Sequence, residues 1–379
     1  MKILHVAPNA YPFTGGIEVL LRNLALYEKN LGINELLIAF PDRSHIFDSQ
    51  FSIDGTRVIP MKVLMQKPTN PLLPKPVYKP SEIVEIFSLY RNLLLTEKPD
   101  VIHLHDYSEA SLPVISVARS LGIPLIQHLH IMITSAFPDD LINNFKNLTN
   151  FIAVSQAAKD ALDRAIGKES NAIVVPNGIP EVSEETLNLS KDHTNIILCV
   201  GRCVPSKGFN RAFNILEGLL KSGIDCRLEF IGAGPTLSHL KVETTARSLD
   251  SRVSFYGLLD RDVVLQKIRT ATVLLVPSES EEGFGLVVAE AGACKTPVVA
   301  TKIGGLVETV EDGVNGYSRE LNDEPGLIEA VAKIITNPKL AEELGEAGYL
   351  RFQRMYGIKE FAAKVDSLYQ LALLKGTIW

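Results

Sequence analysis

The segment from Ser278 to Ala291 contains the residues whose types and spacing most clearly suggest chemistry. Glu282 and Glu290 enclose seven residues that begin Gly-Phe-Gly, and an apolar run, Ala271 to Pro277, precedes them. A strand, a glycine-rich bend and then a helix would place free N–H groups and the positive end of the helix dipole where an anion can bind. Two carboxylates beside that bend predict a ligand with both phosphate and hydroxyl groups, although an isolated glutamate pair is more often a solvated surface feature.

A second group of charged residues follows another predicted strand. Arg202 comes directly after an apolar run, and Lys207 follows five residues later, just before Gly208 and a helical pattern. The segment matches neither the dinucleotide fingerprint nor the P-loop. Because parallel sheets bind ligands at the carboxyl ends of their strands, these cations and the helix after Glu282 can meet one diphosphate. Two cations and a helix end would balance its roughly two negative charges, which predicts binding without a metal.

The first predicted strand also ends at a candidate binding turn. Gly15 and Gly16 come before a helical pattern there, and two glycines let the backbone approach a bulky ligand. An ordinary turn between a strand and a helix is the alternative.

Histidines gather at two further strand ends in the first half of the chain. His103 and His105 form one pair and His128 and His130 another, so the spacing of two places each pair on one face of its strand. His130 ends its strand and is the best placed of the four to reach a ligand, with Asp106 as a weaker candidate. A metal site made of four histidines is the less favoured interpretation, because buried strand histidines commonly only form hydrogen bonds.

Apolar runs alternate with amphipathic stretches along the whole chain, which indicates an α/β protein with parallel sheets covered on both faces. The predicted strands of the first part are residues 2–7, 35–40, 101–106, 124–130, 151–155 and 172–176, with helices near 17–31, 81–96 and 111–121. A polar segment, 181–194, is predicted to be a linker, and strands follow at 195–201, 226–232, 253–257, 273–278 and 297–301. We therefore expect two doubly wound domains, residues 1–184 and 185–356, with a final amphipathic helix within 357–379.

Composition excludes several classes of protein. The 379 residues carry a net charge of −6, which argues against a general nucleic-acid binder. No apolar run reaches the length of a membrane-spanning helix, and the N-terminus reads as a buried strand and not as a signal peptide, so we expect a cytoplasmic protein. The four cysteines show no zinc-type spacing and are predicted to be structural.

Together these motifs resemble the family 4 glycosyltransferases over nearly the whole chain. The matching segments are Gly15–Gly16, His103–Asp106, Ile123–His130, Val174–Pro180, Val200–Gly208, Phe230–Pro235, Glu282–Glu290 and Thr296–Tyr317. The resemblance implies the GT-B fold, in which two Rossmann-like domains face a cleft and the final helix packs back on the N-terminal domain. It also implies metal-independent, retaining transfer of a hexosyl-type sugar from a nucleotide-diphosphate donor to an acceptor hydroxyl.

The resemblance also implies roles for individual residues. The catalytic positions, near the transferred sugar, are His130, from the domain opposite the donor, and Glu282. At the donor-binding positions, Arg202 and Lys207 would hold the diphosphate and Glu290 would bind the ribose hydroxyls. The amides of Phe284, Gly285 and Leu286 would bind the sugar and phosphates, and the turn at Leu258 and Leu259 would bind the base. Gly15 and Gly16 would face the phosphate and the acceptor. The leaving phosphate itself would take the acceptor proton, so stabilisation of the diphosphate would be the largest contribution of the protein.

One residue departs from the family pattern. Lys295 stands where the family commonly has the glycine that ends the helix of the glutamate motif. A left-handed lysine there would cost about 1–2 kcal/mol, or the helix would end differently.

Other functions are compatible with parts of this pattern. A sugar phosphorylase or a nucleotide-sugar epimerase would keep the fold and change the reaction. A sugar-binding protein would leave Arg202, Lys207 and the glutamates without a purpose, and an NAD-dependent dehydrogenase would need a Gly-x-Gly-x-x-Gly turn that is missing. UDP- and GDP-linked donors are both compatible, as are polysaccharide, glycolipid and small-molecule acceptors. The loop Gln66–Pro80, with three lysines, would suit contact with an anionic membrane, which a pI near 5.8 does not favour.

Overall fold

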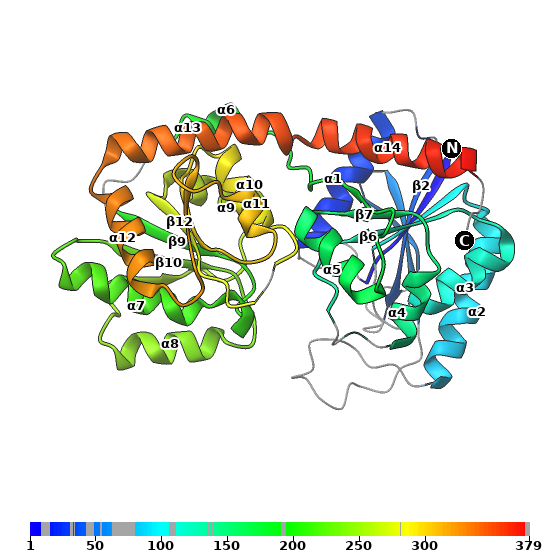
Figure 1. Cartoon of the computed structure of the whole chain (residues 1–379), viewed down its shortest axis with the longest axis horizontal. Coiled ribbons are helices and arrows are strands. Elements are labelled where there is room, and N and C mark those ends of the chain that lie inside the picture. The colour runs from blue at the N-terminus through cyan, green and yellow to red at the C-terminus, as the bar shows by residue number, and fades with distance from the viewer. Residues whose placement is uncertain are drawn as a thin grey trace. The chain divides into compact units, whose positions relative to one another are not determined.

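The structure is a computed structural model that describes residues 1–8, 16–30, 33, 35–42, 49–53, 55–62, 80–105, 111–134, 137, 139–190, 195–280 and 282–375. Gly15, Asp106, residues 66–79 of the proline-rich loop and residues 191–194 of the expected linker lie outside the described residues. The chain divides into an N-terminal unit, Met1–Gly178 with Ile358–Trp379, and a C-terminal unit, Ile179–Gly357. Each unit has its own sheet with helices on both faces (Figure 1).

An eight-stranded sheet forms the centre of the N-terminal unit, in the order β3-β4-β2-β1-β5-β6-β7-β8. Its strands are β1 (Lys2–Val6), β2 (Glu35–Asp42), β3 (Phe51–Ile53), β4 (Thr56–Lys62), β5 (Val101–Leu104), β6 (Leu125–Leu129), β7 (Phe151–Ala153) and β8 (Ile173–Val174). The strands pair in parallel, except that β3 and β4 form an antiparallel hairpin. The order reverses between β1 and β5, so the crevice where such sheets bind ligands lies at the carboxyl ends of these two strands.

The helices of the N-terminal unit cover both faces of that sheet. They are α1 (Gly16–Asn30), α2 (Pro80–Glu97), α3 (Ser111–Leu121), α4 (Asp139–Lys146), α5 (Gln156–Ile166) and α14 (Ile358–Lys375). The last helix packs with α1 over one face, where Phe361 and Tyr369 join Leu24 and Ile3 in a buried cluster. Figure 1 shows α2 and α3 on the opposite side of the sheet. The prediction that the final helix returns to the N-terminal domain is confirmed.

The C-terminal unit is built on a six-stranded parallel sheet in the order β11-β10-β9-β12-β13-β14. Its strands are β9 (Ile196–Val200), β10 (Arg227–Ile231), β11 (Val253–Phe255), β12 (Val273–Val276), β13 (Val298–Thr301) and β14 (Gly316–Arg319). The helices are α6 (Glu184–Leu187), the 3-10 turn η1 (Pro205–Lys207), α7 (Phe209–Lys221), α8 (Leu237–Ala246), α9 (Arg261–Thr270), α10 (Leu286–Ala293), α11 (Leu306–Thr309), α12 (Glu324–Ile335) and α13 (Pro338–Met355). The prediction of two doubly wound parallel sheets is confirmed.

Successive residues of β9 supply two separate cores, as the pleat of a strand requires. Ile197 and Cys199 face the cluster formed with α7 and α12, whereas Ile196 and Leu198 face the cluster formed with α9, α10 and α11. All four cysteines of the chain are buried and unpaired, and burial raises the thiol pKa of Cys294 to about 12. These thiols therefore act as small apolar side chains.

The structure differs from the sequence-based predictions in several short elements. The hairpin of β3 and β4, the strand β14 and the helices α4 and α5 were not predicted. The segment 181–194, interpreted as a linker, contains α6, and the boundary between the units falls earlier, after Gly178. The side chain of Ser183 caps α6, and Arg269 of α9 donates a hydrogen bond to the Leu187 carbonyl at 3.0 Å, so contacts within the C-terminal unit order a sequence that is polar by composition.

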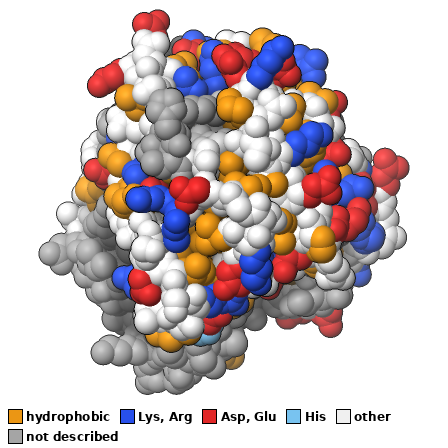
Figure 2. Space-filling model, turned by 90° about the vertical axis from the view of Figure 1, so that its left-hand side faces the viewer, with side chains coloured by type: hydrophobic (Ala, Val, Ile, Leu, Met, Phe, Trp, Pro, Cys, Tyr) orange, Lys and Arg blue, Asp and Glu red, His pale blue; other side chains and the backbone are white. Residues whose placement is uncertain are grey.

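The helices and the surface agree with the composition. Among the described residues, none of the helices combines the length and hydropathy needed to cross a lipid bilayer. On the face shown in Figure 2, basic and acidic side chains are interspersed and do not gather into a patch of one sign.

Candidate functional site

The charged residues predicted to bind the donor lie along one edge of the C-terminal sheet. The strand order reverses between β9 and β12, which are neighbours and run in parallel. Arg202 follows the carboxyl end of β9, and Ser278 and Glu282 follow the carboxyl end of β12. The fold therefore brings the two charged segments to the position where open α/β sheets bind ligands.

Direct backbone contacts fasten these two segments to each other. The N–H of Glu279 donates to the carbonyl of Ser206 in η1 at 2.9 Å. Gly208, which ends η1, has a φ of 62°, and a Cβ atom there would lie 2.0 Å from the carbonyl oxygen of Pro277. Only glycine fits this close approach, and it sets the position of Lys207 relative to the loop after β12.

Lys207 forms an ion pair with Glu282. Its Nζ lies 2.9 Å from Oε1 of Glu282, and the hydroxyl of the buried Ser278 donates to the same carboxylate oxygen. The two charged side chains are 24% and 14% exposed. Glu282 therefore orients Lys207, while its own Oε2 has no partner among the described residues and is available to accept a hydrogen bond. Arg202, by contrast, is exposed and forms no ion pair within the described part of the chain.

The loop between Glu282 and α10 is held by the paired glycines that precede α11. The N–H of Gly305 donates to the Glu282 carbonyl at 2.7 Å, and a Cβ on Gly305 would lie 2.3 Å from the Gly283 carbonyl oxygen. The Phe284 side chain is buried against Tyr356, with ring centroids 5.4 Å apart. Gly285 then starts α10, so the first N–H groups of the helix, including that of Leu286, lack partners within the helix.

Glu290 lies inside α10, and its partner was missed by the sequence analysis. Oε1 of Glu290 lies 3.6 Å from Nε of Arg261, the first residue of α9. Burial raises the pKa of the Glu290 carboxyl, and the Arg261 charge opposes that rise. The Arg261 Nε and Nη2 atoms are buried without a hydrogen-bond partner. A carboxylate and a guanidinium with unused capacity can together bind the hydroxyls of a ribose and a neighbouring polar group.

The turn before Arg261 bears on two predictions. Leu258 is 65% exposed, and Leu259 packs partly against the core, which leaves this turn free to contact a base. The same turn continues into Asp260-Arg261-Asp262, an Asp-x-Asp triplet; the expectation of metal-free binding assumed that the chain has no such triplet, which is wrong. Both aspartates are exposed.

Lys295 adopts the left-handed conformation that its position suggested. Its φ is 55°, and the N–H groups of Lys295 and Thr296 donate to the carbonyls of Gly292 and Ala291 in a Schellman motif. The ammonium forms an ion pair with Glu346 at 2.8 Å and lies 4.8 Å from the Tyr349 ring centroid. Contacts with α13 therefore partly offset the backbone cost of a lysine at the helix end.

In the N-terminal unit, the predicted histidines belong to a larger buried network. We call it the histidine network; its members are His5, Glu28, His103, His105, His128, His130 and Tyr369. The two Glu28 oxygens begin two chains of hydrogen bonds. The sequence analysis missed His5, Glu28 and Tyr369, because they lie in an apolar strand and on two helices at opposite ends of the chain.

The first branch runs from Glu28 Oε2 to His130. His5 Nε2 lies 2.9 Å from Glu28 Oε2, His5 Nδ1 lies 3.0 Å from His105 Nε2, and His105 Nδ1 lies 2.8 Å from His130 Nε2. His130 is only partly buried, and its Nδ1 has no partner among the described residues. Burial nevertheless lowers the pKa of His130 to about 3.

The second branch runs from Glu28 Oε1 to His128. The Tyr369 hydroxyl donates to Glu28 Oε1 at 2.6 Å and lies 2.7 Å from His103 Nδ1, and His103 Nε2 lies 3.1 Å from His128 Nδ1. The His128 Nε2 atom is buried without a partner. Burial lowers the pKa of His103 and His128 well below the ordinary value of a histidine. Burial and the adjacent Glu28 carboxylate raise the pKa of the Tyr369 hydroxyl well above 10.

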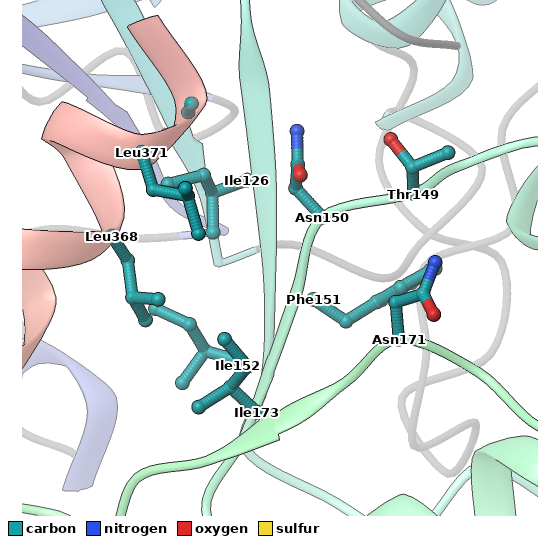
Figure 3. A pocket seen from close by; sticks show the side chains of 10 residues that line it. Ile126, Thr149, Asn150, Phe151, Ile152, Asn171, Ile173, Leu368 and Leu371 are labelled. Atoms are coloured by element: carbon teal, nitrogen blue, oxygen red, sulfur yellow. The ribbon is translucent and has the colours of Figure 1, made fainter. Parts of the chain in front are cut away.

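A separate cavity of about 150 Å³ lies elsewhere in the N-terminal unit. It opens at the amino ends of β6, β7 and β8, where Leu368 and Leu371 of α14 face Ile126, Ile152 and Ile173 (Figure 3). None of the predicted site residues lines it. Of those residues, Gly16 starts α1 and His130 follows β6, while Gly15 and Asp106 lie outside the described residues.

Comparisons with known families and proteins cover the whole length of this arrangement. Residues 14–181 match Glycosyltransferase Family 4, and residues 184–351 match Glycosyl transferases group 1. An uncharacterized glycosyltransferase of Methanocaldococcus jannaschii is 29% identical over 95% of both chains. The phosphatidyl-myo-inositol mannosyltransferase of Mycobacterium leprae is 24% identical over 100% of this chain and 98% of its own.

Solved structures show the same fold. Sucrose-phosphate synthase of Thermosynechococcus elongatus superposes with a TM-score of 0.83 at 21% identity, over 99% of this chain and 100% of the other. Anabaena HepE in complex with UDP and glucose has a TM-score of 0.77 at 20% identity, over 97% and 98% of the two chains.

Proposed function

Since the chain belongs to the family 4 glycosyltransferases, we propose that it moves a hexosyl-type sugar, with retention of configuration, from a UDP- or GDP-linked donor to an acceptor hydroxyl. The transferase class and the GT-B fold follow from the family. The donor is our inference from the site in the C-terminal unit, and the stereochemistry is what the resemblance to the family implies. A role in polysaccharide or glycoconjugate biosynthesis accords with this reaction.

One observation carries the donor proposal. Arg202, Lys207 and the start of α10 lie along one edge of the C-terminal sheet, and the Glu290 carboxylate lies one turn into that helix. A leaving nucleoside diphosphate develops negative charge, which two cations and free helix N–H groups stabilise most strongly where little water enters. Glu290 supplies an acceptor for ribose hydroxyls.

The ion pair between Lys207 and Glu282 gives this site an order of events. Before the donor binds, Glu282 holds the ammonium in place at 2.9 Å. When a phosphate arrives, Lys207 can donate to it with a second hydrogen while it keeps Glu282, because an ammonium has three donors. Glu282 Oε2 can then accept a hydrogen bond from a sugar hydroxyl, so one carboxylate serves both the phosphate-binding cation and the transferred sugar.

We propose that the reaction does not require a metal. The local cations suffice for the roughly two charges of the diphosphate. The triplet Asp260-Arg261-Asp262 is the feature that would support the contrary, because paired aspartates can hold a divalent cation beside a diphosphate. Turnover in excess chelator tests this directly, and Asp262→Asn, expected to retain at least half of the activity, tests the triplet.

Ligand binding and turnover test the proposal in two steps. Thermal shifts with UDP, GDP and ADP should show one nucleotide that stabilises the protein by about 2.7 kcal/mol at one hundred times its Kd. Incubation of the matching nucleotide sugar with candidate acceptors should then release free nucleoside diphosphate and form an α- or β-glycoside of unchanged configuration. Absence of a shift with all three nucleotides would contradict the donor site. Sugar phosphate as the product would instead identify a phosphorylase, and an epimerised donor without release an epimerase.

The acceptor panel can be chosen from the relatives. The Mycobacterium leprae protein is named a phosphatidyl-myo-inositol mannosyltransferase, so an inositol lipid is one acceptor class to include. Oligosaccharides and small polyols represent the other classes. We propose no membrane contact, and transfer to soluble acceptors without vesicles would accord with that.

A further inference from the structure

The histidine network connects one buried carboxylate to the two ends of separate hydrogen-bond chains. Glu28 is 0% exposed and, among the described residues, its oxygens contact only the imidazole of His5 and the hydroxyl of Tyr369. An ionised carboxylate can only accept hydrogen bonds. Both neighbours must therefore donate to an ionised Glu28, and with a neutral His5 ring this fixes the direction of every later hydrogen bond.

We propose that Glu28 is a positioning residue, which sets the tautomers of five histidines and makes His130 Nδ1 a hydrogen-bond acceptor. In the first branch, His5 donates from Nε2 to Glu28, His105 donates from Nε2 to His5, and His130 donates from Nε2 to His105. A neutral imidazole carries one N–H, so each Nδ1 in this branch is an acceptor. At the end of the branch, the free Nδ1 of His130 presents a lone pair.

The second branch has the opposite tautomer. Tyr369 donates to Glu28, so its oxygen accepts from Nδ1–H of His103, and His103 Nε2 accepts from Nδ1–H of His128. This order leaves the buried, unpartnered Nε2 of His128 as a lone pair. A buried acceptor without a partner costs less than an orphaned N–H donor, so the direction that Glu28 imposes also suits His128.

The charge states of the rings agree with this assignment. Burial lowers the pKa of His103, His105 and His128 well below 6.5, so these rings are neutral near pH 7. Burial and Glu28 raise the pKa of the Tyr369 hydroxyl, which therefore keeps its proton and donates it. Neutral rings make the choice of tautomer, and not the charge, the property that the network controls.

A metal ion is the alternative use of these rings. His5, His103 and His105, and likewise His105, His128 and His130, place their ligand atoms within 4.8 Å of one another. Successive partners in the network are, however, 2.7–3.1 Å apart, which is hydrogen-bond distance. Nitrogen ligands about 2.0–2.1 Å from a tetrahedral zinc ion would lie farther from each other, and binding would break the first branch at His105.

The consequence for binding rests on the proposed function. A ring nitrogen with a lone pair can accept from a hydroxyl and cannot donate to a phosphate oxygen. The ligand group that faces His130 is therefore a sugar hydroxyl. The same ring in the other tautomer would favour an anion.

The test is the tautomeric state of each histidine, measured by two-bond ¹H–¹⁵N NMR correlation on protein labelled at its eight histidines. We expect His5, His105 and His130 as the Nε2–H form and His103 and His128 as the Nδ1–H form. Nδ1–H at His130 would overturn the proposal, and so would zinc bound at about one ion per chain in metal analysis of the purified protein.

Glu28→Gln tests the causal role of the carboxylate. An amide offers one acceptor and one donor, so one branch must reverse. The first branch should reverse, because His130 Nδ1–H can donate to water whereas a reversed second branch would bury the His128 N–H without a partner. Turnover should fall about tenfold and Glu360→Gln, an exposed charge change on α14, should leave it unchanged. If all five rings keep their wild-type form in a folded Glu28→Gln protein, the proposal is wrong.

Tyr369→Phe gives a second route that does not depend on the stability of the glutamine variant. It removes the acceptor for His103 and should alter only the second branch, with His130 still Nε2–H. A different His130 tautomer in this variant would contradict the proposal that the two branches are independent. If the tautomers are as stated but no nucleotide sugar is consumed, the proposed function is wrong and the proposed role of Glu28 stands. If nucleotide sugar is consumed but the tautomers are reversed, the proposed role of Glu28 is wrong and the proposed function stands.

Discussion

In both units the strand order reverses beside the first strand, and the two units place different chemistry at this shared topological position. In the C-terminal unit, the edge at β9 and β12 carries the cations Arg202 and Lys207 and the Glu282 carboxylate, which pairs with Lys207. In the N-terminal unit, the corresponding edge at β1 and β5 leads to buried imidazoles linked to a buried carboxylate. The fold thus supplies the location, and the side chains decide whether it suits an anion or a hydroxyl.

The largest expected effect is on the cationic side of this comparison. Lys207→Ala removes a charge-assisted donor to the diphosphate and leaves Glu282 without its ion-pair partner, so kcat/KM should fall by about 10²- to 10³-fold. Kinetics with the identified donor measure this. Lys339→Ala, at a side chain that is 85% exposed in the same unit, is the control and should change kcat/KM less than twofold. Equal turnover of the Lys207 variant and the wild type would show that the diphosphate binds elsewhere.

Glu290→Gln should separate binding from stability. Loss of a charged acceptor for the ribose should weaken nucleotide binding by about 10- to 100-fold. Burial raises the Glu290 pKa, so ionisation of this carboxyl costs folding energy as the pH rises through that pKa. The ligand-free variant should therefore be as stable as the wild type at pH 7.5, or more stable by up to about 1 kcal/mol. Calorimetric Kd and melting temperatures decide, and a much less stable variant would mean that Arg261 depends on the charge.

Acid should destabilise the N-terminal unit before the C-terminal unit. Buried histidines with a lowered pKa stabilise the fold above their unfolded pKa of about 6.5, and this contribution is lost as the pH falls towards the folded value, about 3 for His130. Between pH 6.5 and 5, each such ring costs up to about 2 kcal/mol. Hydrogen exchange at pH 7.5 and 5 should show lost protection in β1, β5 and β6. Loss of hydrogen-exchange protection in β9 and β12 before β1, β5 and β6 would contradict this expectation.

The smallest expected effect concerns the end of α10. Lys295→Gly relieves a left-handed lysine by about 1 kcal/mol and removes the contacts with Glu346 and Tyr349. The two changes largely cancel, so the free energy of unfolding should shift by less than about 1 kcal/mol. Chemical denaturation of the variant measures this shift. Turnover should be unchanged; a large loss would mean that the helix end positions the glutamates.

Local pattern predicted much of the fold. Strands with continuous runs of Val, Ile and Leu, such as β9 and β12, are recognisable because both faces of a parallel sheet are buried. The strand β14, with the sequence GYSR, has no such run, and α6 is a single turn ordered by Ser183 and by Arg269. These elements depend on tertiary contacts that a local pattern does not contain.

The candidate site residues could be identified one by one from the sequence, but the contacts between them could not. Arg202, Lys207, Glu282 and Glu290 stand out by type at strand ends, and their proposed roles stay predictions. Their partners depend on which strands and helices become neighbours in the fold. Arg261, at the start of α9, and Glu290, within α10, are one such pair. The contact between Glu28 and Tyr369 joins residues 341 positions apart, beyond the reach of any local spacing rule.

The contact between Glu28 and Tyr369 has a consequence for how the chain folds during synthesis. The C-terminal unit is one continuous stretch, Ile179–Gly357, whereas the N-terminal unit needs Ile358–Trp379 to complete it. On the ribosome, the second unit to be made has its full sequence while the first still lacks Tyr369 and α14. A chain stopped before Ile358 would therefore leave Glu28 with one donor and an open apolar face, so the part synthesised first is the last to mature.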